Sequence, residues 1–175
     1  MFHEIVSDTV HVDVHPVDPK PGFPFYRLVT SGMSDLPMIV PEGTGAPRYG
    51  ELVMTLPESW KMTTEAFQDE NWYWPVLLIK TLATLPHKYS TRLGLGHTVP
   101  NGDPPRPHAP TTELCCAMLV LPFSVSAQFQ TLKISNEKEI CFSAVMVLYQ
   151  DDIKNESGFG HFAQKIQPSE YVRYG

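Results

Sequence analysis

Hydrophobic and polar side chains alternate near the start of the chain. Valines at positions 10, 12 and 14 lie on one side of the alternation, and His11, Asp13 and His15 lie on the other. A period of two with β-branched residues is typical of a strand with one buried face, so we predict a strand over residues 9–15. Pro16 should end this strand, because proline has no backbone N–H to donate.

Two further strands are predicted over residues 26–31 and 48–56. Both are short apolar runs, and proline- and glycine-rich connectors separate them. The first is followed by the sequence SGMSDLP, in which Gly32 can turn the chain. The side chains of Ser34 and Asp35 can hydrogen-bond to the nearby backbone of this turn.

The clearest helical pattern covers residues 72–85. Apolar residues recur there at helical spacing, and Pro75 suits the first helical position, where its missing N–H costs nothing. Pro86 should end the helix. The preceding segment, residues 57–71, has room for one or two helical turns.

Two strongly apolar runs follow, over residues 113–121 and 140–149. Neither alternates, which is typical of strands covered on both faces, so we expect them to be the central strands of a sheet. A weaker strand over residues 129–134 should form a hairpin with the second run. Residues 151–167 carry an apolar stripe that predicts a final helix, although two glycines weaken it.

Together these elements predict an α+β fold, with a mixed or mostly antiparallel central sheet and helices packed on its faces. A length of 175 residues suits a single domain over residues 1–175. The hydrophobic content of 42% is enough to form a sizeable core.

A segment rich in glycine and proline, residues 93–110, separates the predicted helix from the first apolar run. Glycine frees the backbone and proline removes hydrogen-bond donors, so we predict no regular element within it. Its prolines limit mobility, and its polar side chains are closely spaced. We therefore expect a structured loop that is presented to a partner.

Charge and cysteine content narrow the classes of function. A formal net charge of −6 argues against nucleic acid or an anionic membrane as the main partner, and it fits a basic protein partner. Three cysteines, two of them adjacent, give no disulfide framework, which favours a reducing compartment. No apolar run approaches the ~20 residues of a membrane span, and the first residues show no signal-peptide pattern. We expect a cytoplasmic protein that needs no cofactor.

The histidine-rich first strand raises the question of a metal site. His11, Asp13 and His15 would share one face of a strand, and two imidazoles with a carboxylate can bind Zn²⁺ or Fe²⁺. Alternate residues of a strand lie ~6.5–7 Å apart, which is wide for ligands of one metal ion. A histidine from elsewhere, such as His97, would have to complete the site.

Nucleophilic catalysis would need a serine, cysteine or threonine beside a base. Ser31 or Ser34 with a histidine is one such combination, but the chain has no G-x-S-x-G elbow. The three cysteines fall in apolar strands, where a reactive thiolate is disfavoured.

Six segments, in this order, resemble the suppressor-of-fused domain family in its bacterial form: FHEIVSDTVHVDVHPV, LVTSGMSDLPM, ELVMTLPESW, WPVLLIKTLATLPH, LGLGHTVPNGDPPRP and LCCAML. The resemblance implies a binding module that is not an enzyme, and the family offers no established catalytic residues to transfer. Eukaryotic relatives hold a Gli-type transcription factor, partly by adding its strand to their own sheets. Bacterial members include proteins that look like immunity proteins, which neutralise a toxin.

The polar loops of the resemblance correspond here to residues 30–35 and 96–107. We expect them to form one surface, because each follows an element that should end at the same rim of the sheet. The predicted partner-binding residues are Thr30, Ser31, Met33, Ser34, Asp35, His97, Thr98, Asn101, Asp103 and Arg106.

Three functional hypotheses follow. The first is a protein-binding module of the immunity type, whose partner is a basic toxin domain. The second is a metal-dependent or hydrolytic enzyme that uses His11, Asp13, His15 and His97. The third is a regulatory adaptor that binds an extended peptide at a sheet edge, with residues 9–15 as the candidate edge.

Overall fold

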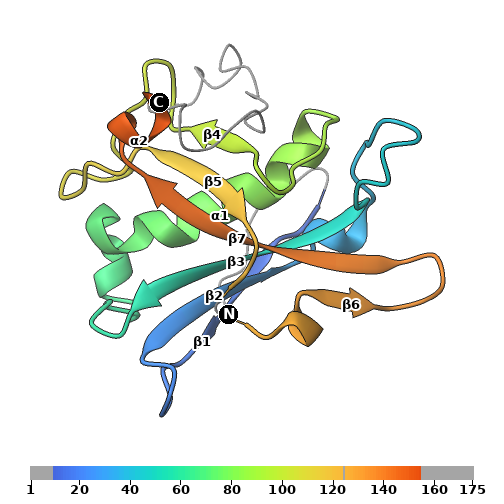
Figure 1. Ribbon diagram of the computed structural model, residues 1–175. Helices are drawn as coiled ribbons and strands as arrows, with labels where there is room; N and C mark the ends of the chain where they lie inside the picture. Colours follow the sequence, from blue (N-terminus) through green and yellow to red (C-terminus); the bar gives the residue numbers. More distant parts are fainter. Residues whose placement is uncertain (1–9, 124, 155–175) are drawn as a thin grey trace.

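A mixed β-sheet with one long helix across a face makes up the protein (Figure 1). The computed structural model describes residues 10–123 and 125–154, and within these residues the sheet has seven strands. The strands are β1 Asp13–Val17, β2 Phe25–Ser31, β3 Tyr49–Pro57, β4 Thr98–Pro100, β5 Cys116–Val120, β6 Thr131–Lys133 and β7 Glu139–Leu148. The α-helices are α1 Glu70–Lys88 and α2 Gln150–Lys154, and short 3₁₀ turns are η1 Met33–Asp35, η2 Ala66–Gln68 and η3 Ala127–Phe129.

The strand order is β1-β2-β3-β7-β5-β4. Strand β6 lies outside this order and pairs with β7, as β5 does. The β3–β7 pair is parallel and all other pairs are antiparallel. The predicted α+β fold with a mixed sheet is therefore confirmed. The predicted hairpin is also confirmed, because β6 pairs antiparallel with the start of β7.

The first strand differs from its prediction in extent. Strand β1 begins at Asp13 and continues through Pro16 to Val17. Proline is tolerated because β1 pairs only with β2 among the described strands, so no neighbour needs its missing N–H. The alternation itself is confirmed, since the valines at 10, 12 and 14 are buried and His11 is exposed.

Helix α1 is longer than predicted at both ends, because neither proline limits it. It begins at Glu70, where the Asp69 side chain caps it by accepting a hydrogen bond from the Asn71 N–H at 2.9 Å. Pro75 therefore lies inside the helix and Pro86 is also within it, so their predicted terminal positions are wrong. Both rings are buried, and their packing offsets the lost helical hydrogen bonds.

The core lies between α1 and the sheet face that it covers. Leu28, Leu52 and Leu119 from three strands pack there with Ile79 and Leu82 from the helix, and all five are almost fully buried. Within the described residues, the opposite sheet face is only partly covered. Met146 of β7 is 36% exposed, so the prediction that this strand is buried on both faces is wrong.

The glycine- and proline-rich segment is not wholly irregular. Residues 98–100 form β4, which pairs with β5 and ends the strand order, so the prediction of no regular element there is wrong. Only the first turn of the predicted last helix, α2, is described, and its remainder lies outside the described residues. In the described part of the chain, no helix is both long enough and apolar enough to cross a membrane.

Candidate functional site

The turn that follows β2 is built around the buried carboxylate of Glu51. Its Oε2 accepts a hydrogen bond from the Thr30 hydroxyl at 2.6 Å, and its Oε1 accepts from the Gly32 and Ser34 N–H groups at 3.1 and 2.9 Å. The Thr30 hydroxyl in turn accepts from the Leu52 N–H at 2.8 Å. Glu51 is only 4% exposed, so these bonds hold the turn without competition from water.

Two further contacts fix the turn in place. Gly32 has φ of 105°, and a Cβ at this position would collide with the carbonyl oxygen of His11, so only glycine fits. His87 of α1 donates from Nε2 to the Met33 carbonyl at 2.7 Å. The turn is therefore tied to β3, to the segment before β1 and to the C-terminal end of α1.

Burial divides the predicted site residues on this turn. Thr30, Met33 and Ser34 are buried, and their polar groups serve the turn itself. Ser31 and Asp35 are exposed. Only these two side chains of the predicted five are accessible to a partner.

The second predicted loop is closed by its own hydrogen bonds. The Asn101 side-chain nitrogen donates to the carbonyls of Arg106 and Pro107 at 2.9 and 3.1 Å, and the Arg106 N–H donates to the Asn101 carbonyl at 2.8 Å. Asp103 and Arg106 are exposed on this loop. Thr98 is partly exposed in β4, whereas His97 is 4% exposed.

The two loops do not form one surface, so that prediction is wrong. The Glu51 turn lies where β3 and β7 begin, at the paired residues Tyr49 and Ile140. Asn101 follows the far end of β4, which the register places beside the end of β7 at Leu148. At about 3.3 Å per residue, these ends of the sheet are roughly 25 Å apart. Strand β4 itself, which the sequence did not predict, carries the second loop to the other end.

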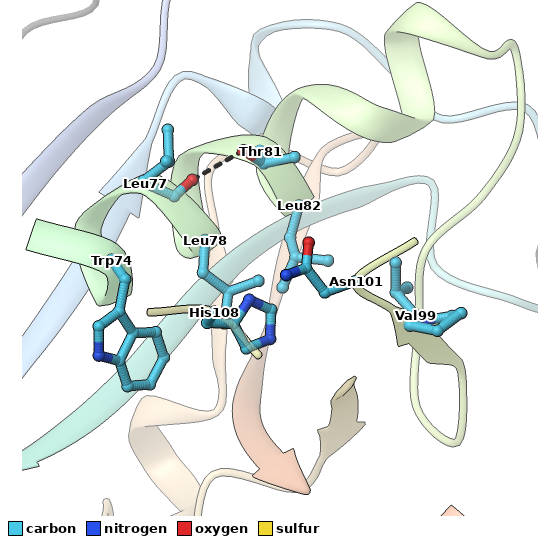
Figure 2. A pocket seen from close by; sticks show the side chains of 9 residues that line it. Trp74, Leu77, Leu78, Thr81, Leu82, Val99, Asn101 and His108 are labelled. Atoms are coloured by element: carbon cyan, nitrogen blue, oxygen red, sulfur yellow. Dashed lines mark hydrogen bonds between the residues drawn. The ribbon is translucent and has the colours of Figure 1, made fainter. Parts of the chain in front are cut away.

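A pocket lies between α1 and the segment that contains β4 (Figure 2). Its volume is about 130 Å³. Asn101 is the one predicted site residue that lines it. The helix contributes Trp74, Leu77, Leu78, Thr81 and Leu82, and the other segment contributes Val99, Pro100, Asn101 and His108.

His108 is the pocket residue with the most unusual environment. Its ring stacks on Trp74 with 5.4 Å between ring centroids and 10° between planes. Its Nε2 is enclosed and has no hydrogen-bond partner among the described residues. Burial lowers the pKa of His108 to about 4, so the ring is neutral at physiological pH.

His97 is also held in its neutral form. Burial lowers its pKa, the charge of Arg92 lowers it further, and the Arg92 carbonyl partly offsets the two. Neither ring nitrogen makes a hydrogen bond of standard geometry within the described residues. His97 is buried directly before β4 and is not part of an accessible surface.

The residues of the metal-enzyme hypothesis are not gathered. His11 Nε2 lies 3.3 Å from Asp13 Oδ1, His15 Nε2 lies 2.8 Å from Ser31 Oγ, and His97 lies at the opposite end of the strand order. Residues 10–123 and 125–154 contain no group of three or more histidine, cysteine, aspartate or glutamate side chains placed to hold a metal ion. The four proposed ligands therefore do not form a first coordination shell.

The hydrolytic version of that hypothesis rests on one contact, between Ser31 and His15. Ser31 is exposed, and neither residue lines the pocket. The thiols are poor nucleophiles, since burial raises the pKa of Cys115 and Cys141 and raises that of Cys116 to about 12.

Sequence patterns pointed to only part of the pocket. Leu77 is apolar but lies outside the buried stripe of α1, and its side chain is 55% exposed. An apolar residue on the solvent side of an amphipathic helix is a detectable signal. The pairing of Trp74 with His108 joins residues 34 positions apart, so no local pattern could reveal it.

Comparison with known proteins identifies the family. The family model described as suppressor of fused protein (SUFU) matches residues 8–167, which is most of the chain. The chain therefore belongs to the suppressor-of-fused family. No curated protein sequence matches it.

Two solved structures are similar in fold. The Sufu–Fu complex crystal structure is 15% identical with a TM-score of 0.55, and the match covers 85% of this chain and 64% of that one. The crystal structure of Drosophila Suppressor of Fused is 14% identical with a TM-score of 0.53, with coverage of 84% and 35%. The chain thus spans less than two thirds of the length of these structural relatives.

Replacing Glu51 should destabilise the protein. The variant Glu51→Ala leaves buried donors without an acceptor, so we expect the free energy of unfolding to fall by about 3 kcal/mol or more. Urea unfolding measures this, with Glu58→Ala at an exposed glutamate as the control. A loss below about 1 kcal/mol, as expected for a surface residue, would contradict the role assigned to Glu51.

Stability should depend on pH through His108. Between pH 4 and 6.5 the unfolded state binds more protons than the folded state, so the stabilisation is complete above pH 6.5 and is lost as the pH falls toward 4. We expect His108→Phe to remove at most about 3 kcal/mol of this acid-induced loss. His97 leaves a residual dependence of the same sign.

Urea unfolding at pH 7.5, 6 and 5 measures the slope of stability against pH. The variant Leu132→Ala, which changes an exposed residue that does not titrate, is the control and should keep the wild-type slope. If the slope of stability against pH is the same for His108→Phe and the wild-type protein, burial does not lower the pKa of His108, and the prediction is contradicted.

Proposed function

We propose that this member of the suppressor-of-fused family is a protein-binding module whose partner docks over the pocket between α1 and β4. The observation that carries the proposal is the pocket itself, which places the exposed Leu77 and the partly exposed ring of His108 beside a closed polar loop. Protein interfaces commonly have an apolar centre and a polar rim. Here the exposed Leu77 would form the centre, and the exposed Asp103 and Arg106 of the neighbouring loop the rim.

The family supports this function. One relative of the same fold has been crystallised as a complex of Sufu with Fu, so that protein binds another protein. The pocket residues also favour binding over catalysis. Neither serine nor cysteine is among the residues that line the pocket, and the Nε2 of His108 is enclosed.

The partner that we propose is a basic toxin domain, which this protein neutralises in the cytoplasm as an immunity protein. The family resemblance supplies the immunity role, and the net charge of −6 supports a basic partner. Complementary charge accelerates encounter, which suits a protein that must capture a toxin before it acts.

A second mode of binding is the pairing of an extended peptide with a sheet edge. Strand β4 is a better candidate for this edge than the predicted edge at residues 9–15. In β4, His97 and Asn101 direct backbone groups toward β5, so the alternate residue Thr98 directs its N–H and C=O away from β5. The other terminal strand, β1, contains Pro16 and lacks one of its donors. A peptide paired with Thr98 would run beside the pocket.

Co-expression tests the immunity role. A basic toxin domain chosen from a neighbouring gene as the candidate partner should be harmless when it is produced together with this protein, and the two should co-purify. We expect Leu77→Asp to abolish both effects by placing a charge in the centre of the interface, with a fall in affinity of at least 100-fold. The control Leu132→Ala changes a leucine of similar exposure on β6. Neither protection nor a complex with the wild-type protein would refute the immunity role.

Backbone pairing at β4 can be tested separately. Thr98→Pro removes the N–H that points away from β5, and it should weaken binding of the partner at least tenfold without lowering the melting temperature. Thr98→Val retains this N–H and should bind as the wild-type protein does. Equal affinity of Thr98→Pro and the wild-type protein, measured by calorimetry, would exclude pairing at this edge.

A further inference from the structure

We infer that the pocket between α1 and β4 receives one uncharged aromatic ring, presented by a side chain of the partner protein. The inference rests on the proposed function, and it adds the chemistry of the group that anchors the partner. Its first experiment can be carried out on this protein alone, without the partner.

The size of the pocket limits its occupant. Its volume of about 130 Å³ is close to the ~150 Å³ of an engineered apolar cavity that binds benzene. A single six-membered ring therefore fills it. An indole is too large for the space, and a short aliphatic side chain would leave much of it empty.

The charge of the lining also limits its occupant. None of the nine lining residues carries a formal charge, because His108 is neutral. An ammonium or carboxylate placed there would lose its hydration without gaining an ionic partner, which is unfavourable. The pocket should therefore exclude lysine, arginine, aspartate and glutamate side chains.

The shape of one wall favours a ring over a branched aliphatic group. Trp74 and His108 stack with 10° between their planes, and together they present aromatic surface beside the leucines of α1. Figure 2 shows Leu77 and Thr81 on the helix side of the pocket, and Asn101 and His108 on the opposite side. A ring between these sides can make offset or edge-to-face contacts, which stabilise it beyond the burial of its surface.

Asn101 gives the pocket a preference among rings. Its side-chain nitrogen is engaged by the Arg106 and Pro107 carbonyls, which fixes the orientation of the amide. Its Oδ1 accepts no hydrogen bond from the described residues, so it is available to a donor on the ligand. A hydroxylated ring should consequently bind more tightly than an unsubstituted one.

The first experiment uses small probes and the wild-type protein. 4-Methylphenol should bind with a dissociation constant on the order of 1 mM, as its size allows. Toluene should bind several-fold more weakly, and butylammonium should not bind. Two-dimensional NMR should show the shifts at the indole N–H of Trp74 and the side-chain amide of Asn101.

Variants locate the probe. Thr81→Phe places a ring at the pocket, and Leu77→Asp places a charge there; both positions are exposed, so the fold should survive. Each should weaken 4-methylphenol binding at least tenfold, whereas Leu132→Ala on β6 should leave it unchanged. The inference is overturned if the probe causes no shifts at Trp74 and Asn101, if butylammonium binds equally well, or if both pocket variants bind as the wild-type protein does.

The second experiment separates this inference from the proposed function. Once the partner complex is in hand, 4-methylphenol should compete with it, and Thr81→Phe should weaken the complex at least tenfold. A complex that forms normally with Thr81→Phe would support protein binding but refute the ring as its anchor. If the probe binds in the pocket but the candidate partner forms no complex with the protein, the proposed function is refuted and the pocket is a site for a free aromatic ligand.

Discussion

The packing of α1 across one face of the sheet is the interaction on which the rest of the structure depends. Its buried stripe, with Ile79 and Leu82 at its centre, closes the core against three strands. The side of the helix that remains exposed supplies one wall of the pocket through Leu77 and Thr81. At its C-terminal end, His87 holds the carbonyl of Met33 and fixes the turn after β2. One helix therefore helps to position both the pocket and the turn after β2.

Periodicity was sufficient to predict most of the sheet and the helix, because burial of one face imposes a regular pattern on a strand or helix. It was not sufficient for the limits of these elements. Pro16 and Pro86 were expected to end regular elements and Pro75 to begin one, and all three lie inside such elements. An edge strand needs no donor on its free side, and buried packing compensates a helix for a missing hydrogen bond. These are tertiary effects that a local pattern does not contain.

The candidate site was harder to predict than the fold, because polarity in a loop has two opposite causes. The hydroxyl of Thr30 and the backbone N–H of Ser34 donate to the buried carboxylate of Glu51, so the polarity of Thr30 serves the fold and not a partner. The signal for this was Glu51 itself, a single charged residue in an otherwise apolar strand. A buried carboxylate requires donors, so the nearby polar turn could have been assigned to it. The Trp74–His108 stack joins distant parts of the chain and left no comparable signal.

Net charge and pocket chemistry act at different stages of binding. A charge of −6 acts over about 10 Å at ordinary ionic strength, so it favours the approach of basic proteins in general. It cannot select among them, because charge at a distance carries little structural detail. The pocket has the complementary property, since its uncharged lining exerts little long-range attraction but discriminates by size and polarity at contact. A net negative charge combined with a neutral, aromatic pocket thus separates the rate of encounter from the choice of partner.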